Sequence, residues 1–185
     1  MIRERMDMKG IIIYSSSTGN TKRMAEYIGN IIGEQYELDV FHVEDSPKID
    51  SYDFILLGGW INKGHIDSKA KKAWKKIKDK PLGLFATLGA DPNSEHGQDM
   101  KKVLENLVKD HTSLGVYLCR GTIDPKLIKH LEGFSGKVIP KGLREKIIES
   151  GRKASEATEE ELEEAARYFL KNIKELDESP PKDYE

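Results

Sequence analysis

The sequence of 185 residues is poor in cysteine and has no long hydrophobic run. Its only cysteine is Cys119, which excludes an intrachain disulfide and a cysteine-based zinc site, and we expect it to be a buried small hydrophobic residue. The longest apolar runs, such as Ile11 to Tyr14, are far shorter than the stretch of about 18 residues that reads as a membrane-spanning helix. A signal-peptide pattern is also lacking. We therefore expect a soluble, cytoplasmic protein with no membrane partner.

An excess of charge of one sign is lacking too, because 30 Lys and Arg nearly balance 32 Asp and Glu. Domains that bind nucleic acids normally carry a basic excess, so we expect no nucleic-acid partner. The balance hides two clusters. Residues 63–80 hold eight lysines against Asp67 and Asp79, a local charge of +6, and residues 156–185 hold eleven carboxylates against four basic residues, a local charge of -7. The lysines are either solvated surface or a docking site for an acidic redox partner or an anionic substrate.

Five apolar runs predict β-strands, and segments of helical periodicity separate them. The runs are 10–14, 36–43, 54–59, 82–88 and 114–119. Apolar residues three or four positions apart predict helices around 24–32, 70–77 and 100–108, and a capping box of Thr158 and Glu161 opens a last helix. Four of the runs are continuously apolar, as in strands with helices on both sheet faces. The pattern predicts an α/β fold with a doubly wound five-stranded parallel sheet of order 2-1-3-4-5 and helices on both faces.

The chain length fits one domain. We expect an N-terminal extension at 1–8, the domain at 9–176 and a disordered tail at 177–185. Residues 120–157 form an extra segment between the fifth strand and the last helix, and two short helices are expected in it near 125–131 and 143–150. Loops of this length are usually functional or locally structured, so this segment is either a lid or a dimer contact.

The stretch "IIIYSSSTGNT", residues 11–21, joins the first strand to the first helix. In a doubly wound sheet, ligands bind outside the carboxyl ends of the strands where the strand order reverses, and this stretch lies there. Its hydroxyl groups, its backbone amides and the helix N-terminus can all donate to phosphate oxygens. It lacks the lysine of GxxxxGK[ST] and the spacing of GxGxxG. The alternative is an ordinary Ser/Thr turn that caps a helix.

"SSSTGNT" after "IIIY" resembles the phosphate loop of the flavodoxins, commonly written (S/T)-x-T-G-x-T. The resemblance implies that flavin mononucleotide (FMN) is the cofactor and that its phosphate contacts Ser16, Ser17, Thr18, Gly19, Asn20 and Thr21. "GGWINKG" and "TLGADPNSEHG" are similar to the two loops that flank the flavin ring. They add the implied contacts Gly58, Gly59, Trp60, Ile61, Asn62, Thr87, Leu88, Gly89, Ala90 and His96.

Several of these residues have a second interpretation from the sequence. Trp60 follows two glycines at a strand end, which favours stacking on the flavin ring over a place in the core or an interface. Trp74 lies on an apolar helical face and is expected in the core. Gly58 and Gly59 allow the backbone to approach the ring or simply form a turn. His96 is either a flavin or substrate contact or an exposed residue at a helix start.

The sequence departs from the flavodoxin pattern at the second flavin loop, which contains no tyrosine or tryptophan. We therefore expect an aromatic residue on only one face of the flavin ring. The segment 120–157 or a partner protein is expected to cover the other face. The basic residues from Lys63 onward also differ from the acidic surroundings typical of flavodoxins. The combination of the "GGW" and "TLGADP" loops with the long segment after the fifth strand is similar to short flavodoxin-family proteins of anaerobic gut bacteria, some of them paired with bilirubin reductase.

The resemblance implies a function, because a flavin supplies the redox chemistry and the protein mainly binds it. We see no catalytic dyad or metal-ligand spacing. The leading hypothesis is an FMN-binding electron-transfer protein that shuttles electrons between a reductase and an acceptor, with redox partners docking on Lys63–Lys80. The first alternative is an NAD(P)H-dependent FMN or quinone reductase of flavodoxin fold, and the second is a phosphate-binding or regulatory module without redox function. The oligomeric state stays open.

Overall fold

A parallel β-sheet forms the centre of the computed structural model, which describes residues 8–133 and 138–179. Its strand order is β2-β1-β3-β5-β6, which confirms the predicted order 2-1-3-4-5 because the short β4 lies off this path. The strands are β1 (Lys9–Tyr14), β2 (Glu37–His42), β3 (Phe54–Asn62), β4 (His65–Ile66), β5 (Leu82–Leu88) and β6 (Ser113–Arg120). The helices are α1 (Asn20–Gly33), α2 (Ser68–Trp74), α3 (Glu95–Val108), α4 (Pro125–Glu132), α5 (Lys141–Lys153) and α6 (Glu159–Glu178).

The sixth strand, β4, was not predicted from the sequence. β3 continues to Asn62 instead of ending at Gly59 and pairs antiparallel with β4. Lys63 and Gly64, between the two strands, both have positive φ, 50° and 81°. This geometry suits a two-residue hairpin turn, because it matches the twist of the flanking strands. The first expected flavin loop is therefore partly a β-hairpin.

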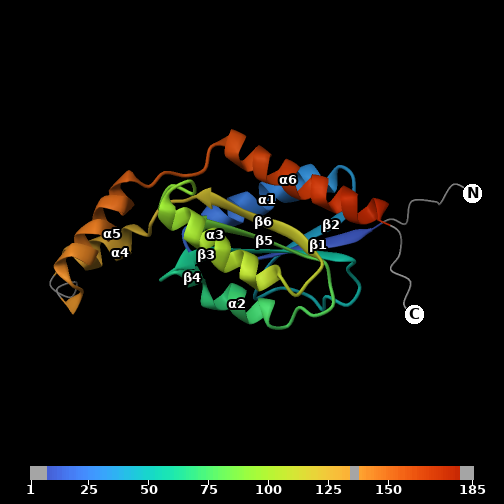
Figure 1. The fold of residues 1–185 in the computed structure, drawn as a ribbon, viewed down its shortest axis with the longest axis horizontal. Helices are drawn as coiled ribbons and strands as arrows, with labels where there is room; N and C mark the ends of the chain where they lie inside the picture. Colours follow the sequence, from blue (N-terminus) through green and yellow to red (C-terminus); the bar gives the residue numbers. More distant parts are fainter. Residues whose placement is uncertain (1–7, 134–137, 180–185) are drawn as a thin grey trace, which may run out of the picture.

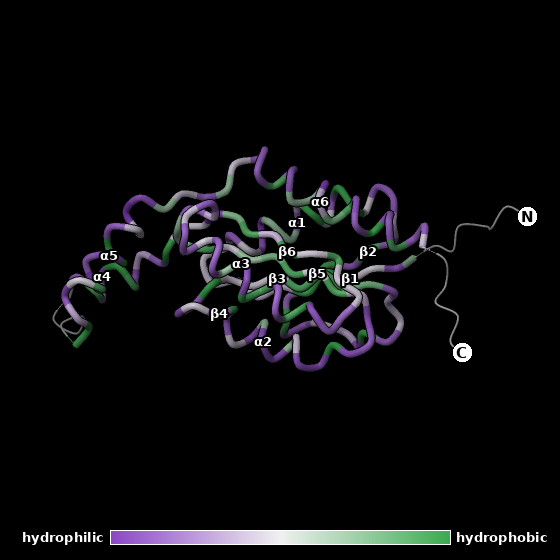
Figure 2. Tube along the Cα trace, viewed as in Figure 1, coloured by the Kyte–Doolittle hydropathy of each residue, from purple (hydrophilic) through white to green (hydrophobic). Residues whose placement is uncertain are grey.

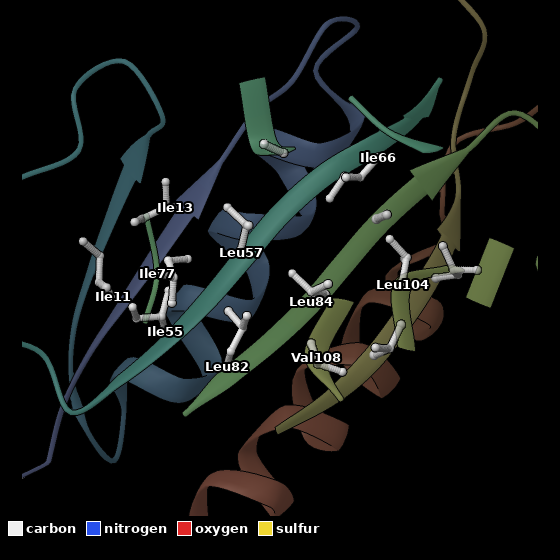
Figure 3. Close-up of a cluster of buried hydrophobic side chains, with 14 of the residues drawn as sticks. Ile11, Ile13, Ile55, Leu57, Ile66, Ile77, Leu82, Leu84, Leu104 and Val108 are labelled. Carbon is white, nitrogen blue, oxygen red and sulfur yellow. The ribbon is translucent and has the colours of Figure 1, made fainter. Parts of the chain in front are cut away.

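Helices cover both faces of the sheet, as predicted (Figure 1). One buried cluster lies between the sheet and α2 and α3, and Figure 3 shows its side chains, among them Leu57, Leu84 and Leu104. The other lies between the sheet and α1 and α6 and includes Met24 and Phe169. Hydrophobic residues accordingly concentrate along the strands in Figure 2. Apolar burial of this kind is the main stabilising contribution to such a fold.

The last helix begins at the predicted capping box, in which the Thr158 hydroxyl accepts a hydrogen bond from the Glu161 amide. It continues through Glu178, so the prediction of a disordered tail from Asp177 is wrong for its first two residues. The long apolar face of α6 explains this, because its packing extends the helix beyond the last predicted core position. Residues 1–7 and 180–185 lie outside the described residues.

Cys119 on β6 is buried, with an exposed fraction of 2%, as predicted. Burial raises the pKa of its thiol to about 12, and the nearby Glu161 carboxylate acts in the same direction. The thiol is therefore neutral and serves as a small core residue. Among the described residues, no helix has the length and apolar composition needed to cross a membrane.

Candidate functional site

The loops that follow β1, β3, β5 and β6 meet at the carboxyl edge of the sheet. The Ser15 amide donates to the Gly58 carbonyl at 3.0 Å, and this bond connects the loop after β1 with strand β3. The Gly121 amide donates to the Leu88 carbonyl at 2.9 Å, which joins the ends of β6 and β5. These bonds place the phosphate loop beside the other loops at the point where the strand order reverses, the usual ligand position of such folds.

The phosphate loop presents free donors at the start of α1. Gly19 is the N-cap and has a left-handed φ of 93°, and no side chain of the described chain caps this helix end. The Ser16 hydroxyl accepts from the Gly19 amide at 3.1 Å, and the Thr18 hydroxyl accepts from the Asn20 side-chain amide. Both hydroxyl hydrogens therefore remain available for a ligand. Ser17 and Thr18 are exposed, and the first turn of α1 contains no acidic residue.

Thr21 and Thr87 also meet at this edge, but their hydroxyl groups bond within the protein. Thr21 is 1% exposed, and its hydroxyl donates to the Gly59 carbonyl at 3.2 Å. The Thr87 hydroxyl lies 3.0 Å from it. Because the single hydrogen of Thr21 is directed at Gly59, this residue fixes α1 against β3 and β5. A phosphate contact from Thr21 stays a prediction.

The sequence analysis missed Asp67, whose carboxylate is 3% exposed and connects three parts of the site. It accepts from the Ser15 hydroxyl at 2.8 Å and from the Trp60 amide at 3.3 Å. It also caps α2 by accepting from the amides of Lys69 at 3.0 Å and Ala70 at 3.2 Å. An aspartate directly before an apolar helical pattern is an N-cap signal, which the sequence does contain.

Trp60 lies inside β3, so its predicted place after the strand end is wrong. It pairs with Thr87 of β5 and is partly exposed at the carboxyl edge. Its carbonyl accepts from the Asp67 amide at 2.9 Å, so Asp67 holds both polar backbone groups of Trp60. Ile61 packs against the first core cluster, and Asn62 is exposed beside the hairpin turn. The indole is therefore held at the edge by a fixed backbone.

Gly58 and Gly59 are explained by packing inside the protein. A Cβ added to Gly58 would lie 2.3 Å from the Phe85 ring. A Cβ added to Gly59 would lie 2.6 Å from the Ile66 side chain. Such distances exclude any larger residue without rearrangement. Their approach to a flavin ring stays a prediction, because internal side chains already fill the space next to each Cβ position.

The second expected flavin loop lies against the segment that follows β6. A Cβ added to Gly89 would lie 2.2 Å from Ile123, and the Asn20 side-chain amide donates to the Thr122 hydroxyl at 2.9 Å. Leu88 is buried, and Ala90 packs on the first core cluster. Thr122 and Ile123 are thus site residues that the sequence analysis did not name. Only the length of the segment indicated that it contributes to a site.

His96 and Trp74 lie on helices, in α3 and α2. Ser94 caps α3 by accepting from the Gly97 amide at 3.1 Å, and His96 is exposed in the first turn. Trp74 packs partly buried on the first core cluster, and its indole donates to the Leu107 carbonyl at 3.0 Å. The predicted core position of Trp74 is therefore confirmed in part, because some of the ring remains exposed.

The fold and the donors of the phosphate loop define an α/β protein whose switch point suits a ligand that carries a phosphate. A family model described as a flavodoxin domain matches residues 11–171. The flavodoxin-like domain-containing protein BilS of Clostridioides difficile (strain CD3) is 32% identical over 170 residues, covering 90% of this chain and 96% of the relative. The chain therefore belongs to the flavodoxin family, and FMN is the cofactor that this membership assigns to its site.

Solved flavodoxins share the fold. A flavodoxin from the domain Archaea superposes with a TM-score of 0.56 at 17% identity, covering 91% of this chain and 99% of the other. Oxidised flavodoxin 2 from Bacillus cereus superposes with a TM-score of 0.55 at 15% identity, covering 90% and 99%. The residues of this chain fit the phosphate of FMN on their own geometry, since an uncapped helix end and hydroxyls that accept from the loop but have no acceptor for their own hydrogen among the described residues suit a phosphate.

Proposed function

We propose that this protein is a redox carrier that holds FMN non-covalently and passes electrons between a reductase and an acceptor. The main observation is the uncapped N-terminus of α1 with available hydroxyls, next to the partly exposed Trp60 at the same edge. Bound FMN supplies chemistry with one or two electrons. In this proposal Ser16, Ser17 and Thr18 donate to the phosphate, and Trp60 stacks on the ring. Asp67 fixes the phosphate loop relative to Trp60, because it accepts from both the Ser15 hydroxyl and the Trp60 amide.

Turnover measurements test the carrier role. The FMN-loaded protein is expected to reduce a protein acceptor after chemical reduction, and to show no steady turnover when NADPH or NADH is supplied with a quinone. Steady turnover with either nucleotide would instead make the protein an NAD(P)H-dependent reductase. Release of the flavin on denaturation tests whether the cofactor is held non-covalently.

Trp60→Ala is expected to weaken FMN binding about five- to 150-fold, because aromatic stacking on a base contributes about 1 to 3 kcal/mol. The fluorescence of the flavin that remains bound should rise, since a stacked indole quenches it. Fluorescence titration of the apoprotein measures both effects. Trp74→Ala is the matched control and should lower thermal stability while leaving FMN affinity within about twofold. Unchanged FMN affinity in Trp60→Ala would place Trp60 outside the ring site.

We further propose that the α2 lysine surface, residues 63–80, docks acidic redox partners. Lys69 pairs with Glu44 at 2.6 Å, and Lys80 donates to the carbonyls of Asp50 and Tyr52. The other lysines of this surface are exposed: Lys63, Lys71, Lys72, Lys75, Lys76 and Lys78. An exposed surface of one sign accelerates encounter with a partner of the opposite sign.

The rate of electron transfer to an acidic partner is therefore expected to fall as salt rises, because exposed charges are screened beyond about 8 to 10 Å at physiological ionic strength. Stopped-flow rates between low and high salt measure this dependence. The double variant Lys71→Glu with Lys75→Glu should show a weaker dependence of the rate on salt. A rate that is constant across the salt range in the unmodified protein would count against docking on these lysines.

A further inference from the structure

The arm, the described residues 121–133 and 138–157, exposes several large apolar side chains. Its helices α4 and α5 extend beyond the carboxyl edge of the sheet, on the side away from the chain termini (Figure 1). No residue of α5 is buried, and Leu131 is the buried residue of α4. Leu127, Leu143 and Val138 are exposed by 46%, 54% and 88%. A helical hairpin with so few buried side chains gains little stability alone and gains more when another surface covers it.

The arm is also basic. The described residues of 121–157 carry seven Lys and Arg against five Asp and Glu, a local charge of +2. Arg152 pairs with Glu132 at 2.7 Å, and Lys153 pairs with Glu149 at 2.6 Å. In contrast, Lys126, Lys129, Arg144 and Lys146 form no ion pair within the described residues. The arm therefore combines apolar contact area with unpaired positive charge.

The base of the arm belongs to the site. The hydrogen bond between Asn20 and Thr122 and the packing of Ile123 against Gly89 attach it to the phosphate loop and to the second flavin loop. The arm thus continues outward from the edge where electrons would leave, whereas α2, which carries part of the α2 lysine surface, lies along one face of the sheet (Figure 1). Both surfaces have the same sign of charge.

We propose that the arm is a docking surface for an acidic redox protein, which contacts its exposed apolar residues and its unpaired basic residues while facing the flavin site. The proposal rests on the carrier function proposed above. Charge complementarity selects an acidic partner over a symmetric pairing of two arms, because two such edges would repel each other. A second copy on this edge would also cover the site that a carrier must present to its acceptor.

Two small haem proteins serve as probes: cytochrome b5, whose haem edge is acidic, and cytochrome c, whose haem edge is basic. The FMN-loaded protein is reduced beforehand with dithionite, and one electron then passes from the cofactor to the haem iron, which changes from Fe(III) to Fe(II). Stopped-flow absorbance follows this change. Reduction of a neutral benzoquinone reports the flavin chemistry without protein docking.

Lys129→Glu with Lys146→Glu, one change on each arm helix, is expected to slow reduction of cytochrome b5 about tenfold at low ionic strength and to speed reduction of cytochrome c. The benzoquinone rate and FMN affinity should stay within about twofold. Lys171→Glu with Lys174→Glu on α6 is the matched control, because it changes the net charge equally at the far end of the molecule (Figure 1). The control should alter the cytochrome b5 rate less than about twofold.

A second variant tests the apolar part of the surface. Leu127→Ser with Leu143→Ser is expected to lower the cytochrome b5 rate about fivefold at high ionic strength, because apolar contacts are not screened by salt. Carbodiimide cross-linking, which joins lysines to carboxylates, should couple cytochrome b5 to arm lysines in the unmodified protein and much less in the charge variant. This readout is independent of electron transfer.

Equal cytochrome b5 rates for the arm charge variant and the α6 control would overturn the proposal. A dimer of the unmodified protein that becomes monomeric in Leu127→Ser with Leu143→Ser, with an unchanged cytochrome b5 rate, would overturn it in favour of a second copy as the occupant. Failure of the carrier function looks different, because the unmodified protein would then either bind no FMN or turn over steadily with NADPH or NADH and a quinone.

Discussion

Replacing Ser17 by alanine together with Thr18 by valine is expected to weaken FMN binding about a hundredfold and to leave riboflavin binding within about twofold. Both hydroxyls are exposed at the start of α1, and Thr18 accepts from Asn20, so its hydrogen remains free. A hydrogen bond to a charged group contributes about 1.5 kcal/mol or more, and two such bonds give about 3 kcal/mol, which corresponds to the hundredfold loss. Riboflavin lacks the phosphate and should not sense the change.

Calorimetric titration of the apoprotein with each ligand gives the two affinities. Ser51→Ala with Thr112→Val is a matched control, because it removes two exposed hydroxyls away from the carboxyl edge. The control should leave both affinities unchanged. If FMN and riboflavin lose equal affinity in the phosphate-loop variant, the phosphate binds elsewhere on the protein.

Asp67→Ala is expected to lower the free energy of unfolding by about 3 kcal/mol. The substitution removes a buried acceptor and leaves the Ser15 hydroxyl and the amides of Trp60, Lys69 and Ala70 without it. Losing a helix cap costs about 1 kcal/mol, and leaving buried donors unpaired adds about 1 to 3 kcal/mol. Urea unfolding of the apoprotein measures the change.

Ser94→Ala is the matched control for this variant, because Ser94 caps α3 through one side-chain bond to the Gly97 amide. Its cost should be about 1 kcal/mol. Asp67→Asn keeps one carbonyl oxygen as an acceptor, so its loss in the free energy of unfolding should lie between those of Asp67→Ala and Ser94→Ala. An Asp67→Ala protein that is no less stable than Ser94→Ala would show that the carboxylate is not the link between the phosphate loop, β3 and α2.

Much of the fold follows from local patterns. The strands were predictable because both sheet faces are covered, so that the runs are continuously apolar, and the α6 start was predictable from its capping box. The hairpin of β3 and β4 was missed because its signal is a two-residue turn, Lys63 and Gly64, inside a segment dominated by lysine. A single glycine between polar residues is a weak turn signal until its positive φ is known.

Candidate site residues could be named from the sequence where they are adjacent in the chain. The phosphate loop is one continuous motif, and it lies at the expected edge. Asp67 and Ser15 are 52 positions apart, and Asn20 and Thr122 are 102 positions apart, so no local pattern brings either pair together. The hydrogen bond from the Thr21 hydroxyl to the Gly59 carbonyl was not predictable from local sequence either, because only the packed sheet determines which acceptor is nearest.

Titration of the apoprotein with FMN, followed by absorbance between about 350 and 500 nm, tests the central claim most directly, because only a bound flavin absorbs there with a shifted spectrum. The account predicts saturation at one FMN per chain and release of intact FMN on denaturation. An apoprotein that keeps its fold and leaves the FMN spectrum unchanged at any concentration would contradict it.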